Sequence, residues 1–262
     1  MSEGSYVLET REVMIRFGGL TAVNNFNIGV PQGSIVGLIG PNGAGKTTCF
    51  NIITGFYKPT KGEVFLEGRP ITGLPPHKVC EAGIARTFQN IRLFYNETVL
   101  QNVMIGGFVR QKSPWWMAPL MFPSCTREEK ELREQAMELL KSVGLDMHAN
   151  EISNSLPYGA QRRLEIARAL ATKPKFLLLD EPAAGMNPQE SQELMDFIKK
   201  IRTDFNLTVL LIEHDMKVVM GVCEHIWVLD YGVLIAEGNP EQIRSNPKVI
   251  EAYLGEEATQ NA

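Results

Sequence analysis

The residues with the clearest chemical potential form the glycine-rich stretch GPNGAGKT at positions 40–47. Its spacing fits G-x-x-x-x-G-K-[ST], in which glycines let several backbone N–H groups point at one phosphate chain. Lys46 can then reach the β- and γ-phosphates, and the Thr47 hydroxyl can ligate Mg²⁺. The alternative, a plain glycine-rich turn, is disfavoured by the apolar strand before it and the helical run after it. We predict a phosphate-binding loop made of Gly40, Pro41, Asn42, Gly43, Ala44, Gly45, Lys46, Thr47 and Thr48.

Two carboxylates, Asp180 and Glu181, directly follow the apolar run FLLL at 176–179. An apolar strand that ends in acids places them at the edge of a sheet, where the phosphates would lie. We expect Asp180 to hold Mg²⁺, directly or through water. Glu181 is then placed to polarise the attacking water as a general base. The alternative, a solvent-facing acidic pair, is disfavoured because the pair accompanies a phosphate-binding loop.

These side chains need an open α/β sheet to position them. The runs 35–39 (IVGLI), 176–179 (FLLL) and 208–212 (TVLLI) are continuously apolar, as expected of buried parallel strands. Each ends in polar or glycine residues, and helical patterns separate them. Such sheets bind ligands beyond the carboxyl ends of their strands. Further strands are predicted at 6–9, 13–17 and 26–30, and a hairpin at 226–229 and 233–237.

The clearest helix is predicted at 126–143, between two parts of the α/β core. Thr126 and Glu129 have the spacing of a capping box, and Gly144 is a stop signal. One face carries the apolar side chains Leu132, Ala136, Leu139, Leu140 and Val143. This position in the chain predicts an inserted helical subdomain.

The composition is that of an ordinary soluble protein. Of 262 residues, 44% are apolar and 21% charged, and the net charge of −4 gives no support for a nucleic-acid partner. No signal peptide is visible, and no run approaches the roughly 18 apolar residues of a membrane span. The four cysteines are scattered, which suits a reducing cytosol. We expect a soluble protein that reaches a membrane only through a partner.

Three further residues, in a family's characteristic order, make the chain resemble the ATP-binding subunits of ABC transporters. Gln89 in RTFQN resembles the Q-loop glutamine, which in that family links the Mg²⁺ site to the helical subdomain and the membrane subunit. His214 in IEHD follows an apolar strand, as does the switch histidine that contacts the γ-phosphate. Phe17 stands where the family has an aromatic that stacks on adenine. The resemblance covers nearly the whole chain.

The resemblance implies an α/β fold: a P-loop ATPase core with a mostly parallel sheet, an N-terminal antiparallel β subdomain and an inserted helical subdomain. A single nucleotide-binding domain would span 1–262. Its P-loop and β core would comprise 1–92 and 161–240, its helical subdomain 93–160, and its C-terminal tail 241–262. The resemblance also implies catalysis by Glu181, His214, Gln89 and Lys46. The implied metal ligands are Thr47, Gln89 and Asp180.

The family's signature motif, LSGGQ, aligns with LPYGA at 156–160, so only Leu156 and Gly159 match. In the family this element reaches across a dimer interface to the other subunit's ATP. We expect that role for Leu156, Gly159 and the N-terminal N–H groups of a helix that starts near Ala160. Our hypothesis is that Ser155 supplies the hydroxyl that the family's serine would provide. Asn187 is a second departure, since it retains an acceptor where the family's D-loop usually ends in aspartate.

The branch indicated is the ATP-binding subunit of branched-chain (hydrophobic) amino acid importers. The stretches LPYG, EPAAGMNPQE and GNPEQIRSNPKVIEAYLG resemble that branch, whose larger ATPase subunit also carries a segment like residues 107–125. The lipopolysaccharide-transport ATPase has a similar ending but lacks this insertion, and another ABC importer is a further alternative. The apolar residues 115–122 of the insertion either meet a permease or lipid headgroups, or fold back onto the helical subdomain, which we favour.

The implied partners are a second ATP-binding subunit, identical or related, integral membrane permease subunits and, indirectly, a substrate-binding protein. The implied cofactors are ATP and Mg²⁺, and the implied location is cytoplasmic, peripheral on the inner face of the cell membrane through the permease. Two rival classes fit poorly. A soluble ABC ATPase of DNA repair or translation would need a coiled-coil insert, tandem domains or basic patches. A P-loop kinase of small metabolites would lack the series of Gln89, signature and His214.

Overall fold

The structure, a computed structural model, describes residues 6–111 and 123–260. In this part of the chain, two compact units are found: one up to Gln89 and again from Lys175 onward, the other from Asn90 to Pro174. We call them the nucleotide unit and the helical unit. None of the described helices is both long and apolar enough to cross a lipid bilayer.

The nucleotide unit is built on a larger sheet with strand order β10-β9-β3-β8-β7-β6. Its strands from β9 to β6 run parallel, and only β10 is antiparallel to its neighbour. The strands are β3 (Ile35–Ile39), β6 (Ile84–Arg86), β7 (Phe176–Asp180), β8 (Thr208–Ile212), β9 (His225–Asp230) and β10 (Val233–Gly238). Every residue of β3, β7 and β8 is buried, and apart from Thr208 and Asp180 these strands have no polar side chain, as expected of strands covered on both faces.

A smaller antiparallel sheet has the order β2-β1-β4-β5. Its strands are β1 (Tyr6–Phe17), β2 (Leu20–Pro31), β4 (Lys61–Leu66) and β5 (Arg69–Pro70). The two strands predicted at 6–9 and 13–17 are in fact one strand, β1, with an irregular register between Thr10 and Val13. Glu12 there has a positive φ of 48°, and its N–H donates to Asn27 Oδ1 at 2.7 Å. This β-bulge interrupts the strand pattern of the sequence, so that one continuous strand looks like two.

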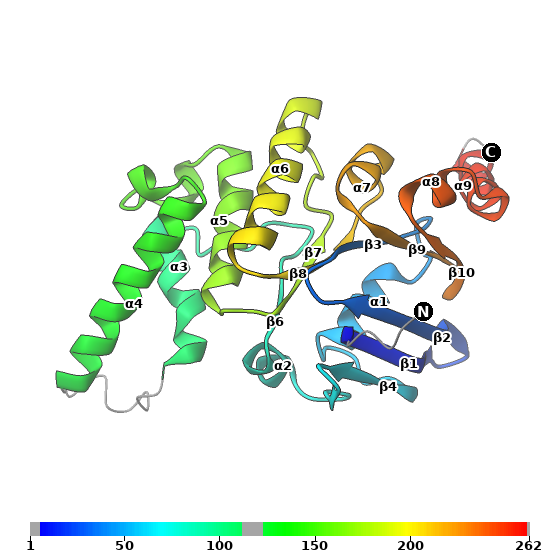
Figure 1. The fold of residues 1–262 in the computed structure, drawn as a ribbon, viewed down its shortest axis with the longest axis horizontal. Coiled ribbons are helices and arrows are strands. Elements are labelled where there is room, and N and C mark those ends of the chain that lie inside the picture. The colour runs from blue at the N-terminus through cyan, green and yellow to red at the C-terminus, as the bar shows by residue number, and fades with distance from the viewer. Residues whose placement is uncertain (1–5, 112–122, 261–262) are drawn as a thin grey trace. The chain divides into compact units, whose positions relative to one another are not determined.

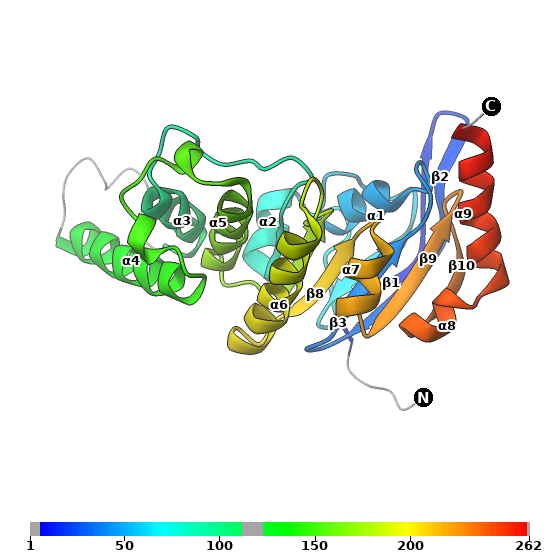
Figure 2. The ribbon, with the colours of Figure 1, turned by 90° about the horizontal axis from the view of Figure 1, so that it is seen from above.

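Helices cover both faces of the larger sheet in the nucleotide unit. Helices α6 (Pro188–Asp204) and α7 (Met216–Val222) lie on one face, and α1 (Lys46–Ile53) lies on the other, toward the smaller sheet (Figure 1; Figure 2). Side chains of α1 and both sheets share one apolar core that includes Phe26, Phe50 and Trp227. This core holds α1 against both sheets.

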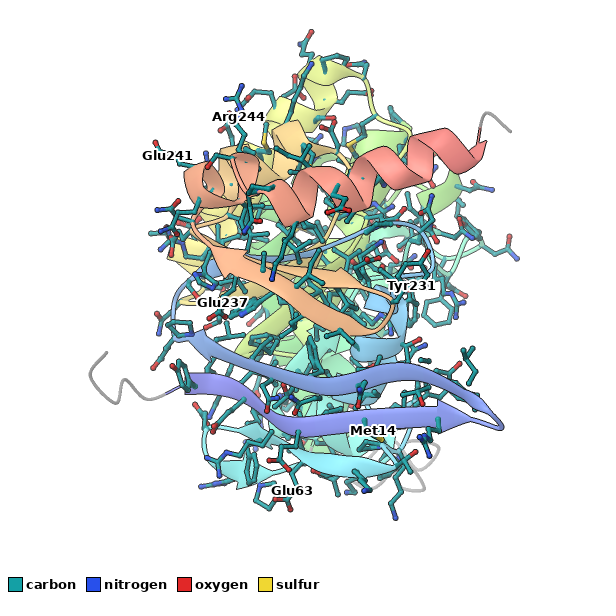
Figure 3. The ribbon with its side chains drawn as sticks, turned by 90° about the vertical axis from the view of Figure 1, so that its right-hand side faces the viewer. Met14, Glu63, Tyr231, Glu237, Glu241 and Arg244 are labelled. Carbon is teal, nitrogen blue, oxygen red and sulfur yellow. The ribbon has the colours of Figure 1, made fainter. Side chains whose placement is uncertain are left out.

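The remaining helices of this unit are α2 (Pro76–Ala82), α8 (Pro240–Arg244) and α9 (Pro247–Gln260). The β9–β10 hairpin carries Tyr231 at its tip, with α9 running alongside (Figure 3). Trp227 Nε1 donates to Glu237 Oε2 across this hairpin at 2.8 Å. The predicted hairpin at 226–229 and 233–237 is therefore confirmed, one residue longer at three of its four ends.

The helical unit contains α3 (Val99–Gly107), η1 (Phe108–Arg110), α4 (Pro123–Ser142), η3 (Asp146–His148), η4 (Ser153–Ser155) and α5 (Tyr158–Ala171). Helix α3 contacts both α4 and α5. The predicted apolar face of α4 is buried. The capping box predicted at Thr126 is wrong, because α4 begins at Pro123 and Thr126 lies inside it. Residues 112–122, which include all of the insertion's apolar residues 115–122, lie outside the described residues.

Candidate active site

The loop 40–45 joins the end of β3 to the start of α1. Lys46, the first residue of α1, is only 8% exposed, and its ammonium donates to Gly40 O at 2.6 Å and Pro41 O at 2.8 Å. Asn42, Gly43 and Thr47 are exposed, and Thr48 is partly exposed. A cation thus lies inside a loop whose outer residues and helix N-terminus face solvent, as anion binding requires.

At two positions of this loop, neighbouring strands leave no room for any residue but glycine, whether or not a ligand is bound. Gly40 has φ +151°, and a Cβ there would lie 1.9 Å from Leu229 O. Gly45 has φ +103°, and a Cβ would lie 2.8 Å from Ala22 O. At Gly43, with φ +77°, a Cβ would meet no described atom within 4 Å. The first two glycines let β9 and β2 approach the loop, whereas the space at Gly43 faces outward.

Asp180 is the last residue of β7 and is 5% exposed. Its Oδ2 accepts a hydrogen bond from Arg86 Nη2 at 2.6 Å. Among the described residues no group of three or more His, Cys, Asp or Glu side chains is arranged to hold a metal ion. One carboxylate with one hydroxyl, here Asp180 and Thr47, nevertheless suits Mg²⁺, which usually keeps several waters and binds substrate phosphates.

Two other predicted site residues, Gln89 and His214, lie next to Glu181. Its Oε2 accepts a hydrogen bond from Gln89 Nε2 at 2.8 Å and lies 3.6 Å from His214 Nδ1. Its backbone N–H donates to Ile212 O at 2.9 Å, and its φ is +45°. The Glu181 side chain is 20% exposed, and that of His214 61%. The sharp turn after β7 therefore presents a solvent-accessible carboxylate between an amide and an imidazole.

The predicted adenine-stacking residue, Phe17, ends β1 and is 45% exposed. Its ring packs edge-on against Tyr57, with centroids 5.3 Å apart. The exposed ring leaves a face available to a planar ligand.

The signature residues Leu156 and Gly159 belong to the helical unit. Leu156 is buried, and its carbonyl accepts a hydrogen bond from Gln161 Nε2 at 2.8 Å. Helix α5 begins at Tyr158, two residues before the predicted start, so Gly159 lies in its first turn. The hydroxyl of Ser155 donates to Ile152 O at 2.8 Å.

Comparison with known proteins identifies the family to which this chain belongs. Residues 23–184 match the family model described as ABC transporter. The chain belongs to the ABC transporter family of ATP-binding proteins. Residues 233–259 match a second family model, described as branched-chain amino acid ATP-binding cassette transporter. As an ABC ATP-binding protein the chain is an ATPase, and the predicted P-loop ATPase fold is confirmed.

Individual relatives and similar structures support the membership of this chain in the ABC family. The high-affinity branched-chain amino acid transport ATP-binding proteins BraF of Pseudomonas aeruginosa and LivG of Escherichia coli are each 49% identical to it, over 95% of this chain and 98% of theirs. A crystal structure of a nucleotide-free ATP-binding cassette from an ABC transporter superposes with a TM-score of 0.83 at 32% identity, over 95% of this chain and 98% of that one. A dimeric ATP-binding cassette, MJ0796 bound to ADP and Pi, gives 0.73 at 29%, over 89% and 98%.

Two residues next to the site of this ABC protein, Arg86 and Glu213, were missed by the sequence reasoning, as was the capping role of Asn187. Arg86 pairs with Asp180, as described above. Asn187 caps α6: its Oδ1 accepts from Gln189 N and Glu190 N, and Glu190 Oε2 accepts from Asn187 N. The only sequence signal for this cap was Asn-Pro followed by a glutamate three residues after the asparagine.

The second missed residue is Glu213, which is fully buried. Its Oε1 accepts from Ala183 N at 2.7 Å, while Oε2 finds no partner within the part of the chain that is described. Burial raises the pKa of Glu213 above its ordinary value. Glu213 therefore ties the segment after Glu181 to the segment that carries His214.

Proposed function

We propose that this ATPase powers the import of branched-chain amino acids through a separate membrane permease. The observation that carries the chemistry is the Glu181 carboxylate, held by Gln89 and 3.6 Å from His214. It follows β7, whose carboxyl end lies at the same edge of the sheet as that of β3, which leads into the phosphate-binding loop. The branched-chain assignment is supported by the match of residues 233–259 and by the names of the relatives. The 49% identity to BraF and LivG over 95% of this chain weighs against the lipopolysaccharide-transport alternative.

ATP binding would use residues that the structure already aligns. The backbone N–H groups of residues 42–48, at the start of α1, would hold the phosphates, and Lys46 would exchange its carbonyl partners Gly40 O and Pro41 O for phosphate oxygens. Phe17 would stack on adenine. Thr47, Asp180 and Gln89 would hold Mg²⁺, which when bound neutralises charge on the phosphate oxygens.

Hydrolysis would then depend on Glu181. Its carboxylate accepts a proton from water as the water oxygen bonds to the γ-phosphorus, and the bond to the bridging oxygen breaks to give ADP and phosphate. Gln89 and His214 lie next to this carboxylate and would orient it, and His214 would also contact the γ-phosphate. Catalysis is mostly positioning and charge stabilisation, because phosphoryl transfer needs little covalent chemistry from the protein.

The assembly would contain two ATP-binding subunits, head to tail, with Leu156 and Gly159 of one completing the ATP site of the other. The dimeric cassette among the similar structures supports this arrangement. ATP would favour the closed dimer because it fits only the assembled site, and hydrolysis would release it. The subunits would lie on the inner face of the cell membrane, attached to the permease. Substrate selection would belong to the permease and a substrate-binding protein.

The transport assignment is tested by uptake in cells from which the gene for this chain has been deleted. Reintroducing the wild-type chain is expected to restore uptake of labelled leucine, isoleucine and valine, whereas Lys46→Ala is not. Uptake of labelled lysine in the same cells is the control for general loss of transport. Unchanged leucine uptake in the deleted cells, with loss of another solute's uptake, would replace the branched-chain assignment by that solute.

A further inference from the structure

The ion pair between Arg86 and Asp180 has no role in the mechanism above. It joins the end of β6 to the end of β7, with 2.6 Å between Arg86 Nη2 and Asp180 Oδ2. The Arg86 and Asp180 side chains are only 6% and 7% exposed. A buried carboxylate without a counter-charge is strongly unfavourable, so the guanidinium stabilises Asp180 in the metal-free protein.

The guanidinium of Arg86 is fixed on several sides. Its Nη1 donates to Asn51 Oδ1 at 2.7 Å and to Thr54 Oγ1 at 3.4 Å, both in the α1 segment. The ring centroids of Phe50 and Phe88 lie 5.5 Å and 5.1 Å from Arg86 Cζ. Its Nε is buried and has no hydrogen-bond partner among residues 6–111 and 123–260. These contacts aim a rigid cation at the carboxylate that the proposed function assigns to Mg²⁺.

We propose that Arg86 is a positioning residue for the metal site: it holds Asp180 while no metal is present and competes with Mg²⁺ for its carboxylate. The inference rests on the proposed metal role of Asp180. A guanidinium at Oδ2 opposes a divalent cation by charge repulsion and by occupying a ligand lone pair. Mg²⁺ alone therefore binds poorly, and it enters together with ATP, whose phosphates supply further ligands.

Removing the cation is expected to make the protein sensitive to Mg²⁺ alone. In thermal unfolding without nucleotide, millimolar Mg²⁺ leaves the wild-type midpoint unchanged. Arg86→Gln lowers the midpoint without metal, and Mg²⁺ then raises it. The apparent affinity for Mg²⁺ rises by about tenfold or more, the scale typical of groups that contact a metal ligand. Arg86→Lys gives an intermediate response, because it keeps the charge without the planar fork.

Three further variants separate this role from a packing role. Arg202→Gln, which removes a paired arginine of the same unit outside the site, stays insensitive to Mg²⁺. Asp180→Asn alone and with Arg86→Gln shows no response to Mg²⁺. In the Asp180→Asn background, Arg86→Gln costs less stability than in the wild type, because no buried charge is left unpaired. A pure packing role would cost the same in both backgrounds.

The proposal is overturned if Arg86→Gln and Arg86→Lys fold and their midpoints ignore Mg²⁺ as the wild type does. It is also overturned if the cost of Arg86→Gln is equal in both backgrounds. Failure of the proposed metal role has a different signature: Asp180→Asn would then keep the wild-type dependence of ATP hydrolysis on Mg²⁺.

Discussion

At the scale of single residues, the site depends on backbone conformations and buried charges that other elements impose. Gly40 lies against the carbonyl of Leu229, and Glu213 Oε1 accepts a hydrogen bond from the N–H of Ala183. Neither constraint follows from local spacing, because the partners are far apart in the chain. The sequence predicts the glycines through a known pattern, but it contains no signal that Asp180 pairs with Arg86 across 94 positions.

Substitution at Gly40 is expected to damage the loop much more than substitution at Gly43. Gly40→Ala forces the backbone of Leu229 aside, with a loss of more than about 3 kcal/mol in the free energy of unfolding. Gly43→Ala has only the strain of a positive φ, about 1–2 kcal/mol. Urea unfolding measures both. Equal losses would contradict the assignment of the Gly40 requirement to contact with β9.

Glu213 is expected to make stability fall as pH rises. Because burial raises its folded-state pKa above 4.5, the folded protein retains a proton there that the unfolded chain releases. Wild-type stability thus decreases from pH 4.5 up to that raised value, and is not regained above it. Glu213→Gln keeps an acceptor for Ala183 N without the charge.

The measurement is the difference in unfolding free energy, Glu213→Gln minus wild type, against pH. It should grow by roughly 1.4 kcal/mol per pH unit at most across that window. Exposed Glu138→Gln is the control for loss of a surface carboxylate. A difference that shrinks as pH rises would show that Glu213 is stabilising as a carboxylate.

At the scale of elements, the hydrophobic pattern predicts the central strands well. The predicted 35–39 and 208–212 coincide with β3 and β8, because strands buried on both faces leave an unbroken apolar run. Predictions of element ends were weaker. The bulge at Glu12 makes the single strand β1 look like two strands in the sequence, and α4 begins before its predicted cap at Thr126. Both differences arise because local sequence signals do not show which backbone hydrogen bonds form.

Helix α5 has a glycine that its own fold does not need. At Gly159 a Cβ would meet no described atom within 4 Å, so Gly159→Ala should stabilise the helix by about 0.5 kcal/mol or more. If the proposed partner nucleotide approaches this turn, the same change lowers the steady-state ATPase rate several-fold. Urea unfolding and ATPase assays test the two effects separately. Full activity in a stabilised variant would contradict the proposed contact.

Ser155→Ala belongs in the same ATPase assay. A lower rate would support Ser155 as the replacement for the family's serine. An unchanged rate, together with loss of activity in Gly159→Asp, would leave only the N–H groups of α5 in that role.

At the scale of the whole molecule, the sequence indicates family and fold more directly than it indicates geometry. Motifs spread from Gly40 to His214 occur in the order of the ABC family, and the family matches bear out that membership. The order of the motifs does not give the distances between their side chains. The hydrogen bond of 2.8 Å from Gln89 Nε2 to Glu181 Oε2, and the 3.6 Å between Glu181 Oε2 and His214 Nδ1, follow only from the folded sheet. The central claim is that this cluster hydrolyses ATP within a dimer.

Glu181→Gln tests that claim most directly, by steady-state ATPase rate and by light scattering with and without Mg-ATP. The rate should fall by about 100-fold or more, because the amide cannot accept the proton, while ATP binding continues. An ATP-dependent dimer should therefore accumulate, whereas Lys46→Ala, the control for loss of ATP binding, should stay monomeric. A Glu181→Gln variant that hydrolyses ATP near the wild-type rate and stays monomeric would contradict both the general base and the sandwich.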